Sequence, residues 1–129
     1  MDEHSGRLSE HLEDYLEAIA QLESESGAAR PTDIAATLKI KKPSVTSALG
    51  ALSERGLVVY EKYKPVSLTP EGRKVAASVR RKHELLRGFF VKILGVDQAS
   101  ADVAACRMEH ALDDSIMHKL VKFLRSLEK

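Results

Sequence analysis

The stretch Gly56-Leu-Val-Val-Tyr-Glu-Lys-Tyr-Lys-Pro-Val-Ser-Leu-Thr-Pro-Glu-Gly72 decides the fold. Two short β-prone runs, residues 57–60 and 66–68, flank a basic turn at residues 61–65, which is the pattern of a β-hairpin. Thr69-Pro70-Glu71 follows directly and is typical of the start of a helix, because Thr caps well and Pro needs no partner there. The order predicts a hairpin that leads straight into a helix.

Two short helical patterns precede the hairpin. Pro31-Thr32-Asp33 opens the first, and Ile40-Lys41-Lys42 forms the turn after it. Pro43 suits the first turn of the second helix, where its missing N–H costs nothing, and Gly56 ends that helix. Two short helices, a tight turn and a β-hairpin predict a winged helix-turn-helix.

Longer helical patterns lie on both sides of this module. Apolar residues recur at helical spacing over residues 8–24, where Ser5 or Ser9 could cap the helix. We expect a long helix from Thr69 to about Leu94 and two more, over residues 98–111 and 114–127. The predicted fold is mainly α with a small β-hairpin: a winged helix-turn-helix DNA-binding domain over residues 1–75, then a helical metal-binding and dimerisation domain over residues 76–129.

Charge is distributed unevenly along the 129 residues, although the net charge is only +1. Residues 1–29 carry one Arg against eight acidic residues, residues 30–82 carry twelve Lys or Arg against four, and residues 83–129 carry seven of each. The regional charges are therefore −7, +8 and 0. A basic middle segment is the electrostatic pattern of a nucleic-acid binder.

The second helix of the module is expected to enter the DNA major groove by its N-terminal residues. Its first residues are small or hydroxyl-bearing and can reach phosphates or base edges, while the lysines can neutralise phosphates. The alternative is an ordinary solvated basic face, which the order of the elements disfavours. The candidate DNA-binding residues are Lys41, Lys42, Pro43, Ser44, Thr46, Ser47, Lys62 and Lys64.

The run Cys106-Arg-Met-Glu109-His110 places a thiol, a carboxylate and an imidazole at positions i, i+3 and i+4, so all three share one helix face. Each is a good ligand for a divalent transition metal. Asp14 and Glu17 repeat the i, i+3 spacing on the first helix, and His83 lies on the long helix. Alternatively, Cys106 is a small buried hydrophobe and its neighbours are surface residues.

The whole chain resembles the DtxR/MntR family of metal-dependent transcriptional repressors. The resembling segments are residues 11–19, 30–35, 43–46, 56–60, 68–72, 81–86 and 105–110, in the family order. The resemblance implies metal ligands from the first helix, the long helix and the next helix. Carried over residue by residue, these are Asp14, Glu17, His83, Cys106, Glu109 and His110.

The resemblance mixes iron-type and manganese-type features. Cys106 occurs in iron-responsive and in some manganese-responsive members, whereas Asp14 and Glu17 match the manganese type. The iron-type ancillary site has a Glu and a second His where this chain has Arg87 and Asp102. We expect Mn(II) or Fe(II) as the cofactor, with Mn(II) slightly favoured. Zn(II) or Co(II) could also bind in vitro.

The same resemblance implies a homodimer that binds operator DNA when loaded with metal and so represses metal-homeostasis genes. A metal would join the acidic first helix to the Cys106 helix and fix the spacing of the two recognition helices. Because the sequence ends at Lys129, we expect a short form without the SH3-like C-terminal domain. It has a polar N-terminus and no apolar run near the ~20 residues of a membrane span, so we expect a cytoplasmic protein with no membrane partner.

Two other functions fit parts of the sequence. A winged-helix regulator without a metal could sense a thiol oxidant through Cys106, or a small ligand, since Arg107 and His110 could lower the pKa of the thiol. A hydrolytic enzyme could use Cys106, Glu109 and His110. The chain lacks a Gly-rich phosphate loop and a nucleophile elbow, which disfavours an enzyme.

Overall fold

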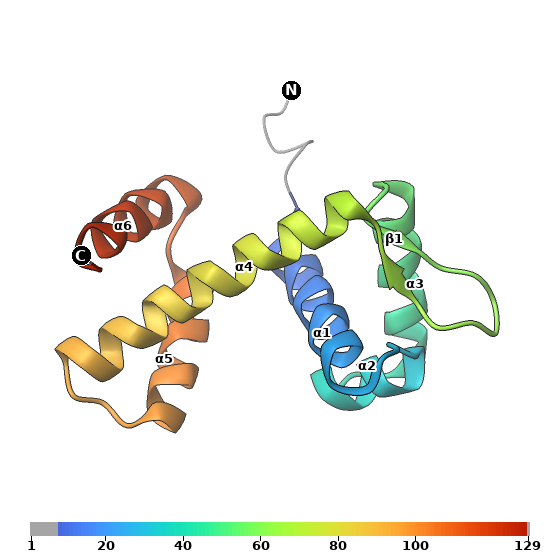
Figure 1. The fold of residues 1–129 in the computed structure, drawn as a ribbon, viewed down its shortest axis with the longest axis horizontal. Coiled ribbons are helices and arrows are strands. Elements are labelled where there is room, and N and C mark those ends of the chain that lie inside the picture. The colour runs from blue at the N-terminus through green and yellow to red at the C-terminus, as the bar shows by residue number, and fades with distance from the viewer. Residues whose placement is uncertain (1–7, 129) are drawn as a thin grey trace. The chain divides into compact units, whose positions relative to one another are not determined.

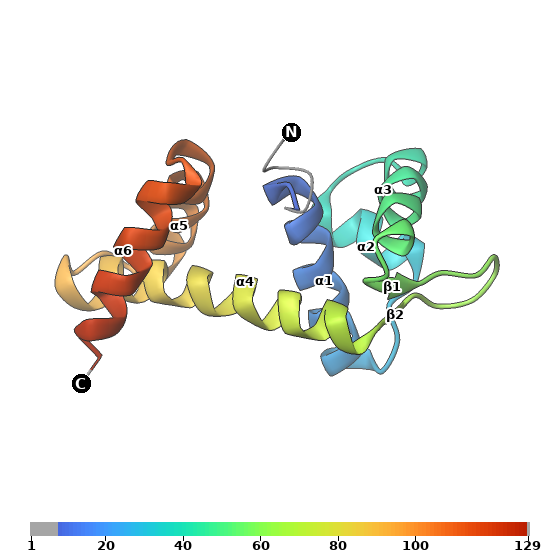
Figure 2. The same cartoon turned by 90° about the horizontal axis from the view of Figure 1, so that it is seen from above.

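The computed structural model describes residues 8–128, apart from the side chains of Glu10 and His110. The chain divides into two compact units, Met1–Val79 and Arg80–Lys129. Helices and one small hairpin make up the described part, as expected (Figures 1 and 2). The elements are α1 (Glu10–Ser26), α2 (Pro31–Leu38), α3 (Lys42–Glu54), β1 (Val58–Val59), β2 (Ser67–Leu68), α4 (Pro70–Gly88), the π-helical turn η1 (Phe89–Ile93), α5 (Gln98–Ala111) and α6 (Asp114–Ser126).

The core of the first unit forms around the apolar face of α1. Ser9 caps this helix by accepting a hydrogen bond from the Leu12 N–H (3.2 Å), while Ser5, the other predicted cap, lies outside the described residues. Fully buried side chains from α1, α2, α3 and the hairpin meet in one cluster. Its largest members are Tyr15, Leu16, Ile19, Ile34, Val45, Leu49, Leu52 and Val66.

The hairpin pairs β1 with β2 in antiparallel register, Val58 opposite Leu68 and Val59 opposite Ser67. The intervening loop extends away from the helices as the wing (Figure 2). α1 continues to Ser26, two residues beyond the apolar pattern of residues 8–24, and Ala29 forms a β-bridge with Val66. The Val66 N–H donates to the Ala29 carbonyl (2.7 Å), so this segment anchors the wing.

The start of α4 is fixed by Thr69, as its sequence predicts. The Thr69 hydroxyl accepts from the Gly72 N–H (3.0 Å) and donates to the Gly56 carbonyl (2.7 Å). A Cβ atom at Gly72 would overlap the carbonyl oxygen of Leu57, so only glycine allows α4 to approach the hairpin this closely. Gly56 has φ of +75°, which suits the glycine that ends α3.

The second unit packs α5 and α6 around the end of α4. Asp97 and Asp113 cap α5 and α6 by accepting from the backbone N–H groups of Ser100 (3.0 Å) and Ile116 (2.9 Å). The hydrogen bonds from Ser100 lower the pKa of Asp97 below its usual value. The apolar core contains Leu85, Leu86, Ala105, Met117 and Leu124.

The predicted long helix to about Leu94 is present, but its last turn is not α-helical. Residues Phe89–Ile93 form a π-helical turn, with the Leu94 N–H bonded to the Phe89 carbonyl (3.3 Å). Single π turns within α-helices are rare and have no residue signature of their own, so an apolar run such as Phe89–Ile93 is first interpreted as α-helical.

Several large apolar side chains of the second unit stay exposed. The sequence places Ile116, Leu120, Phe123, Leu124 and Leu127 on one stripe, but only Leu124 is fully buried. The exposed set is Ile93, Leu94, Val103, Ile116, Phe123 and Leu127. Within residues 8–128 no helix is both long enough and apolar enough to cross a membrane.

Candidate metal centre and nucleic-acid interface

His83 on α4 lies between two carboxylates of α5. Its Nδ1 atom is 3.3 Å from Glu109 Oε1, and its Nε2 atom is 3.5 Å from Asp102 Oδ1. The side chains of His83 and Glu109 are 25% and 12% exposed, whereas Asp102 is 52% exposed. The imidazole is thus held in a partly buried position with a carboxylate at each ring nitrogen.

Helix register explains this arrangement. Asp102 and Glu109 are seven residues apart, or nearly two full turns of α5, so both face the same way. His83 and Arg87 are four residues apart on α4 and also share a face. Arg87 Nε lies 3.7 Å from Asp102 Oδ1. The Arg87–Asp102 pair and the His83–Glu109 pair therefore both link α4 to α5.

The structure brings together some of the predicted metal ligands. His83 and Glu109 meet, and Cys106 is exposed on α5 one turn before Glu109, so the alternative of a buried hydrophobic cysteine is wrong. Asp14 and Glu17 are partly buried on α1 in the first unit. The side chain of His110 lies outside the described part of the structure. In that part, no three His, Cys, Asp or Glu side chains converge closely enough to hold a metal ion.

The His83–Glu109 pair has the spacing that two metal ligands require. Two donor atoms about 2.1 Å from one metal lie roughly 3.0 to 3.4 Å apart at bond angles of about 90 to 109°. The observed separation of Nδ1 and Oε1, 3.3 Å, falls in this range. An imidazole nitrogen and a carboxylate oxygen are also donors that suit Mn(II), Fe(II) and Zn(II), so the chemistry of these two residues fits a divalent transition metal.

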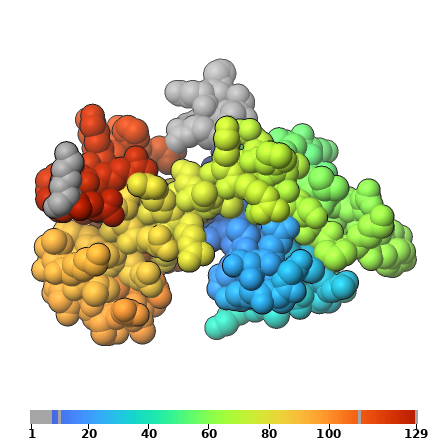
Figure 3. Space-filling view, viewed as in Figure 1, coloured from blue at the N-terminus to red at the C-terminus, as the bar shows by residue number. Residues whose placement is uncertain are grey.

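The predicted DNA-binding side chains are all exposed, on the start of α3 and on the wing. Lys42, Thr46, Lys62 and Lys64 line a cavity of about 340 Å³, and none of the described residues that line it is acidic. Lys62 Nζ lies 5.3 Å from the centre of the Tyr63 ring, and Lys64 pairs with Glu61 (2.9 Å). In the space-filling view the wing forms the protruding yellow-green edge of the first unit (Figure 3).

The same cavity contains residues that the sequence interpretation missed. These are Arg30, Pro31, Thr32 and Tyr60. Arg30 directly precedes α2 and is exposed. The excess of basic residues over residues 30–82 pointed to this region as a DNA-binding surface. Only the fold shows that Arg30 lines the same cavity as Lys42 and Lys62.

Comparison with known proteins identifies both halves of the chain. Residues 7–66 match the family model described as the iron dependent repressor, N-terminal DNA binding domain. Residues 69–129 match the iron dependent repressor, metal binding and dimerisation domain. An HTH-type transcriptional regulator of Methanocaldococcus jannaschii is 36% identical over 124 residues, which cover 94% of this chain and 98% of the relative. The chain belongs to the DtxR/MntR family of metal-dependent transcriptional repressors.

Other relatives of the repressor are longer. The diphtheria toxin repressor of Corynebacterium diphtheriae is 33% identical over 122 residues, which cover 95% of this chain and 54% of that protein. A solved manganese-dependent transcriptional repressor in complex with manganese matches with a TM-score of 0.74 at 27% identity, covering 88% of this chain and 52% of the other. The repressor therefore spans about half the length of these two proteins.

These comparisons confirm the predicted family, the winged-helix fold class and a metal-dependent repressor function. The family consists of transcriptional regulators, which gives no support to a hydrolytic enzyme. They also give no support to the alternative of a metal-independent thiol sensor.

Proposed function

We propose that this repressor binds Mn(II) through Asp14, Glu17, His83, Cys106, Glu109 and His110, and then binds operator DNA as a homodimer. The observation that carries the proposal is the approach of His83 Nδ1 to Glu109 Oε1 across α4 and α5. The proposal is supported by the distance of 3.3 Å between a nitrogen and an oxygen donor on two helices, which is compatible with binding to one metal. The other four ligands rest on the family resemblance.

Mn(II) is favoured over Fe(II) by the oxygen ligands of the proposed set. Asp14, Glu17 and Glu109 contribute carboxylates, which hard cations prefer, whereas only Cys106 contributes sulfur. The thiolate keeps Fe(II) as the alternative. Zn(II) and Co(II) should bind in vitro as well, since nitrogen and sulfur ligands favour them.

The proposed switch begins on α1. Asp14 and Glu17 add to a strongly acidic N-terminal segment, where like charges repel one another. A bound divalent cation supplies positive charge that offsets this repulsion. Tyr15, between these two residues in the sequence, is fully buried and donates a hydrogen bond to the Ser44 carbonyl at the start of α3 (3.4 Å). A change at the ligands of α1 therefore has a direct route to the recognition helix.

The proposed DNA contacts divide by type. Lys41, Lys42, Lys62 and Lys64, together with Arg30, would neutralise phosphates and set the position of the repressor. We propose that Pro43, Ser44, Thr46 and Ser47 at the start of α3 face the bases in the major groove. A dimer is required because two recognition helices about 34 Å apart match one turn of the duplex.

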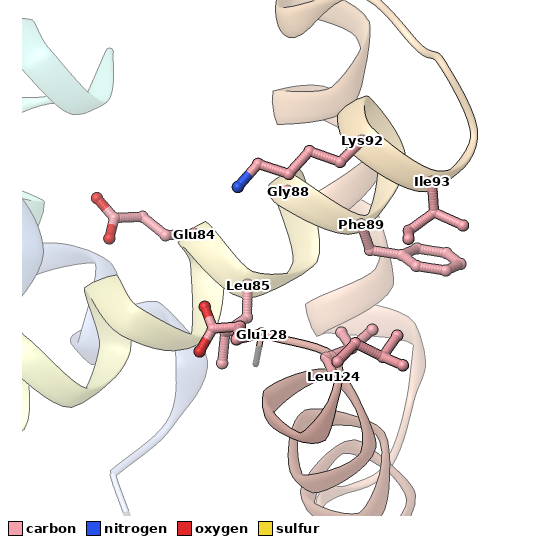
Figure 4. Close-up of a pocket in the computed structure, with 9 residues that line it drawn as sticks. Glu84, Leu85, Gly88, Phe89, Lys92, Ile93, Leu124 and Glu128 are labelled. Atoms are coloured by element: carbon pink, nitrogen blue, oxygen red, sulfur yellow. The ribbon is translucent and has the colours of Figure 1, made fainter.

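The proposed dimer surface lies on the second unit. A groove of about 470 Å³ is lined by Leu85, Phe89 and Ile93 on one side and Leu124 and Leu127 on the other, together with the charged residues Glu84, Lys92 and Glu128. Phe89 and Ile93, from η1, lie near Leu124 of α6 in the close-up (Figure 4). Exposed apolar surface of this kind commonly marks an interface, and the family model for these residues includes dimerisation.

Binding titrations under anaerobic conditions test the metal site. We expect Mn(II) to bind the wild type more tightly than Fe(II) does when both titrations are made at the same pH. Glu109→Ala and His83→Ala should each weaken Mn(II) binding at least tenfold, because each removes a proposed ligand. The matched control is His118→Ala, which changes an exposed histidine on α6 and should leave the affinity unchanged.

Circular dichroism melting curves of all variants separate loss of a ligand from loss of fold. Unchanged Mn(II) affinity in both folded variants, His83→Ala and Glu109→Ala, would rule out the proposed site. Tighter binding of Fe(II) than Mn(II) would leave the site in place and reverse the proposed metal.

A further inference from the structure

Asp102 and Arg87 are conspicuous because neither belongs to the proposed ligand set, yet both lie beside it. Arg87 Nε, Asp102 Oδ1 and His83 Nε2 are linked by distances of 3.7 Å and 3.5 Å, and His83 Nδ1 continues the series to Glu109 (3.3 Å). The four side chains alternate between α4 and α5. Asp102 is thus the one residue of the series that contacts His83 on the edge opposite to Glu109.

The two ring nitrogens of His83 are therefore chemically distinct. A neutral imidazole has one N–H donor and one nitrogen with a free lone pair, and only the latter can bind a metal. Each ring nitrogen faces a carboxylate, Glu109 at Nδ1 (3.3 Å) and Asp102 at Nε2 (3.5 Å), and of these two residues only Glu109 belongs to the proposed ligand set. A metal shared with Glu109 would take the Nδ1 lone pair in place of this hydrogen bond, and the ring proton would then lie on Nε2, facing Asp102.

Arg87 restrains the orientation of the Asp102 carboxylate. The Asp102 side chain is half exposed, so on its own it would adopt several orientations in solvent. The guanidinium, four residues after His83 on the same face of α4, approaches the oxygen that also faces the imidazole. It therefore favours the orientation in which Asp102 contacts His83.

We propose that Asp102 is a positioning residue that holds His83 in its Nε2–H tautomer, so that Nδ1 binds the metal, and that Arg87 orients Asp102 for this role. The inference rests on the proposed function of His83 as a ligand. Carboxylates that orient metal-binding histidines typically change metal affinity by about 10- to 100-fold when they are removed. Asp102 thereby extends the metal centre beyond the residues that touch the ion.

Nitrogen-15 NMR of the full chain loaded with Zn(II), which is diamagnetic, tests the tautomer directly. We expect the long-range ¹H–¹⁵N spectrum to show His83 with a protonated Nε2 and a metal-bound Nδ1. Asp102→Ala should weaken Zn(II) and Mn(II) binding about 10- to 100-fold. Asp102→Asn retains an acceptor oxygen and should restore most of the affinity. Val103→Ala, at the next and exposed position on α5, is the control and should bind as the wild type does.

Other outcomes discriminate between the inference and the function on which it rests. Metal on Nε2, or full affinity in a folded Asp102→Ala protein, would overturn the inference while leaving the site intact. Unchanged affinity in His83→Ala would instead refute the proposed role of His83, and the inference with it.

Discussion

Tyr15 shows how one residue can connect the proposed metal site to the DNA-reading surface. It follows Asp14 directly, its ring is fully buried in the core of the first unit, and its hydroxyl donates to the Ser44 carbonyl on α3. Burial raises the pKa of Tyr15 above its usual value of 10.0, because the phenolate would lose hydration. The neutral phenol therefore stabilises the fold and holds α1 against α3.

The pH dependence of unfolding tests this role. Since the pKa of Tyr15 is higher in the folded state than in the unfolded state, its contribution is fully present below about pH 10 and is lost as the pH rises through the folded pKa. The free energy of unfolding, measured with urea, should fall more steeply above pH 10 in the wild type than in Tyr15→Phe. Tyr63→Phe, at an exposed site on the wing, should follow the wild type. Parallel profiles for Tyr15→Phe and the wild type would contradict the account.

At the scale of elements, local residue chemistry made much of the fold predictable. Pro43, Gly56 and Thr69 each have a conformational or capping preference that fixes an element boundary, and each lies where that preference requires. Contacts between distant segments were not predictable in this way. The bridge between Ala29 and Val66 depends on how α1 and the hairpin pack, and no local pattern encodes it.

In the candidate site, too, local features were predictable from the sequence and contacts between helices were less so. Helical spacing placed Cys106 and Glu109 on one face, and the resemblance supplied His83 as their partner. The resemblance also placed Asp102 at an ancillary-site position, but its contact with the Nε2 edge of the His83 ring depends on the packing of α5 against α4 and no local pattern encodes it. Arg30 was missed for a related reason, because only the folded wing brings it into the basic cavity.

The wing and the start of α2 should act as one phosphate-binding element. Arg30→Ala should weaken DNA binding with little change in sequence preference, and should reduce the slope of log K against log salt by about 0.9 per protomer. Fluorescence anisotropy over a range of KCl concentrations measures that slope. Arg125→Ala, an exposed arginine on α6, is the matched control. A slope unchanged by Arg30→Ala would remove Arg30 from the interface.

In the whole repressor, metal sensing and DNA binding belong to different parts of one chain. The binding of metal must therefore be energetically coupled to the binding of DNA. The family models assign DNA binding to residues 7–66 and metal binding with dimerisation to residues 69–129. A metal can raise DNA affinity only by binding more tightly to the DNA-competent state, and typical couplings change affinity about 5- to 150-fold. The affinity for DNA must therefore differ measurably between the metal-loaded and the metal-free repressor.

The most direct test measures DNA affinity with and without metal. The probe is a labelled duplex selected by the Mn(II)-loaded full chain from a random-sequence library, and binding is followed by anisotropy under anaerobic conditions. The account predicts at least tenfold tighter binding in Mn(II) than in EDTA, and loss of that difference in Glu109→Ala. Equal affinity for the selected duplex in Mn(II), Fe(II) and EDTA would contradict it.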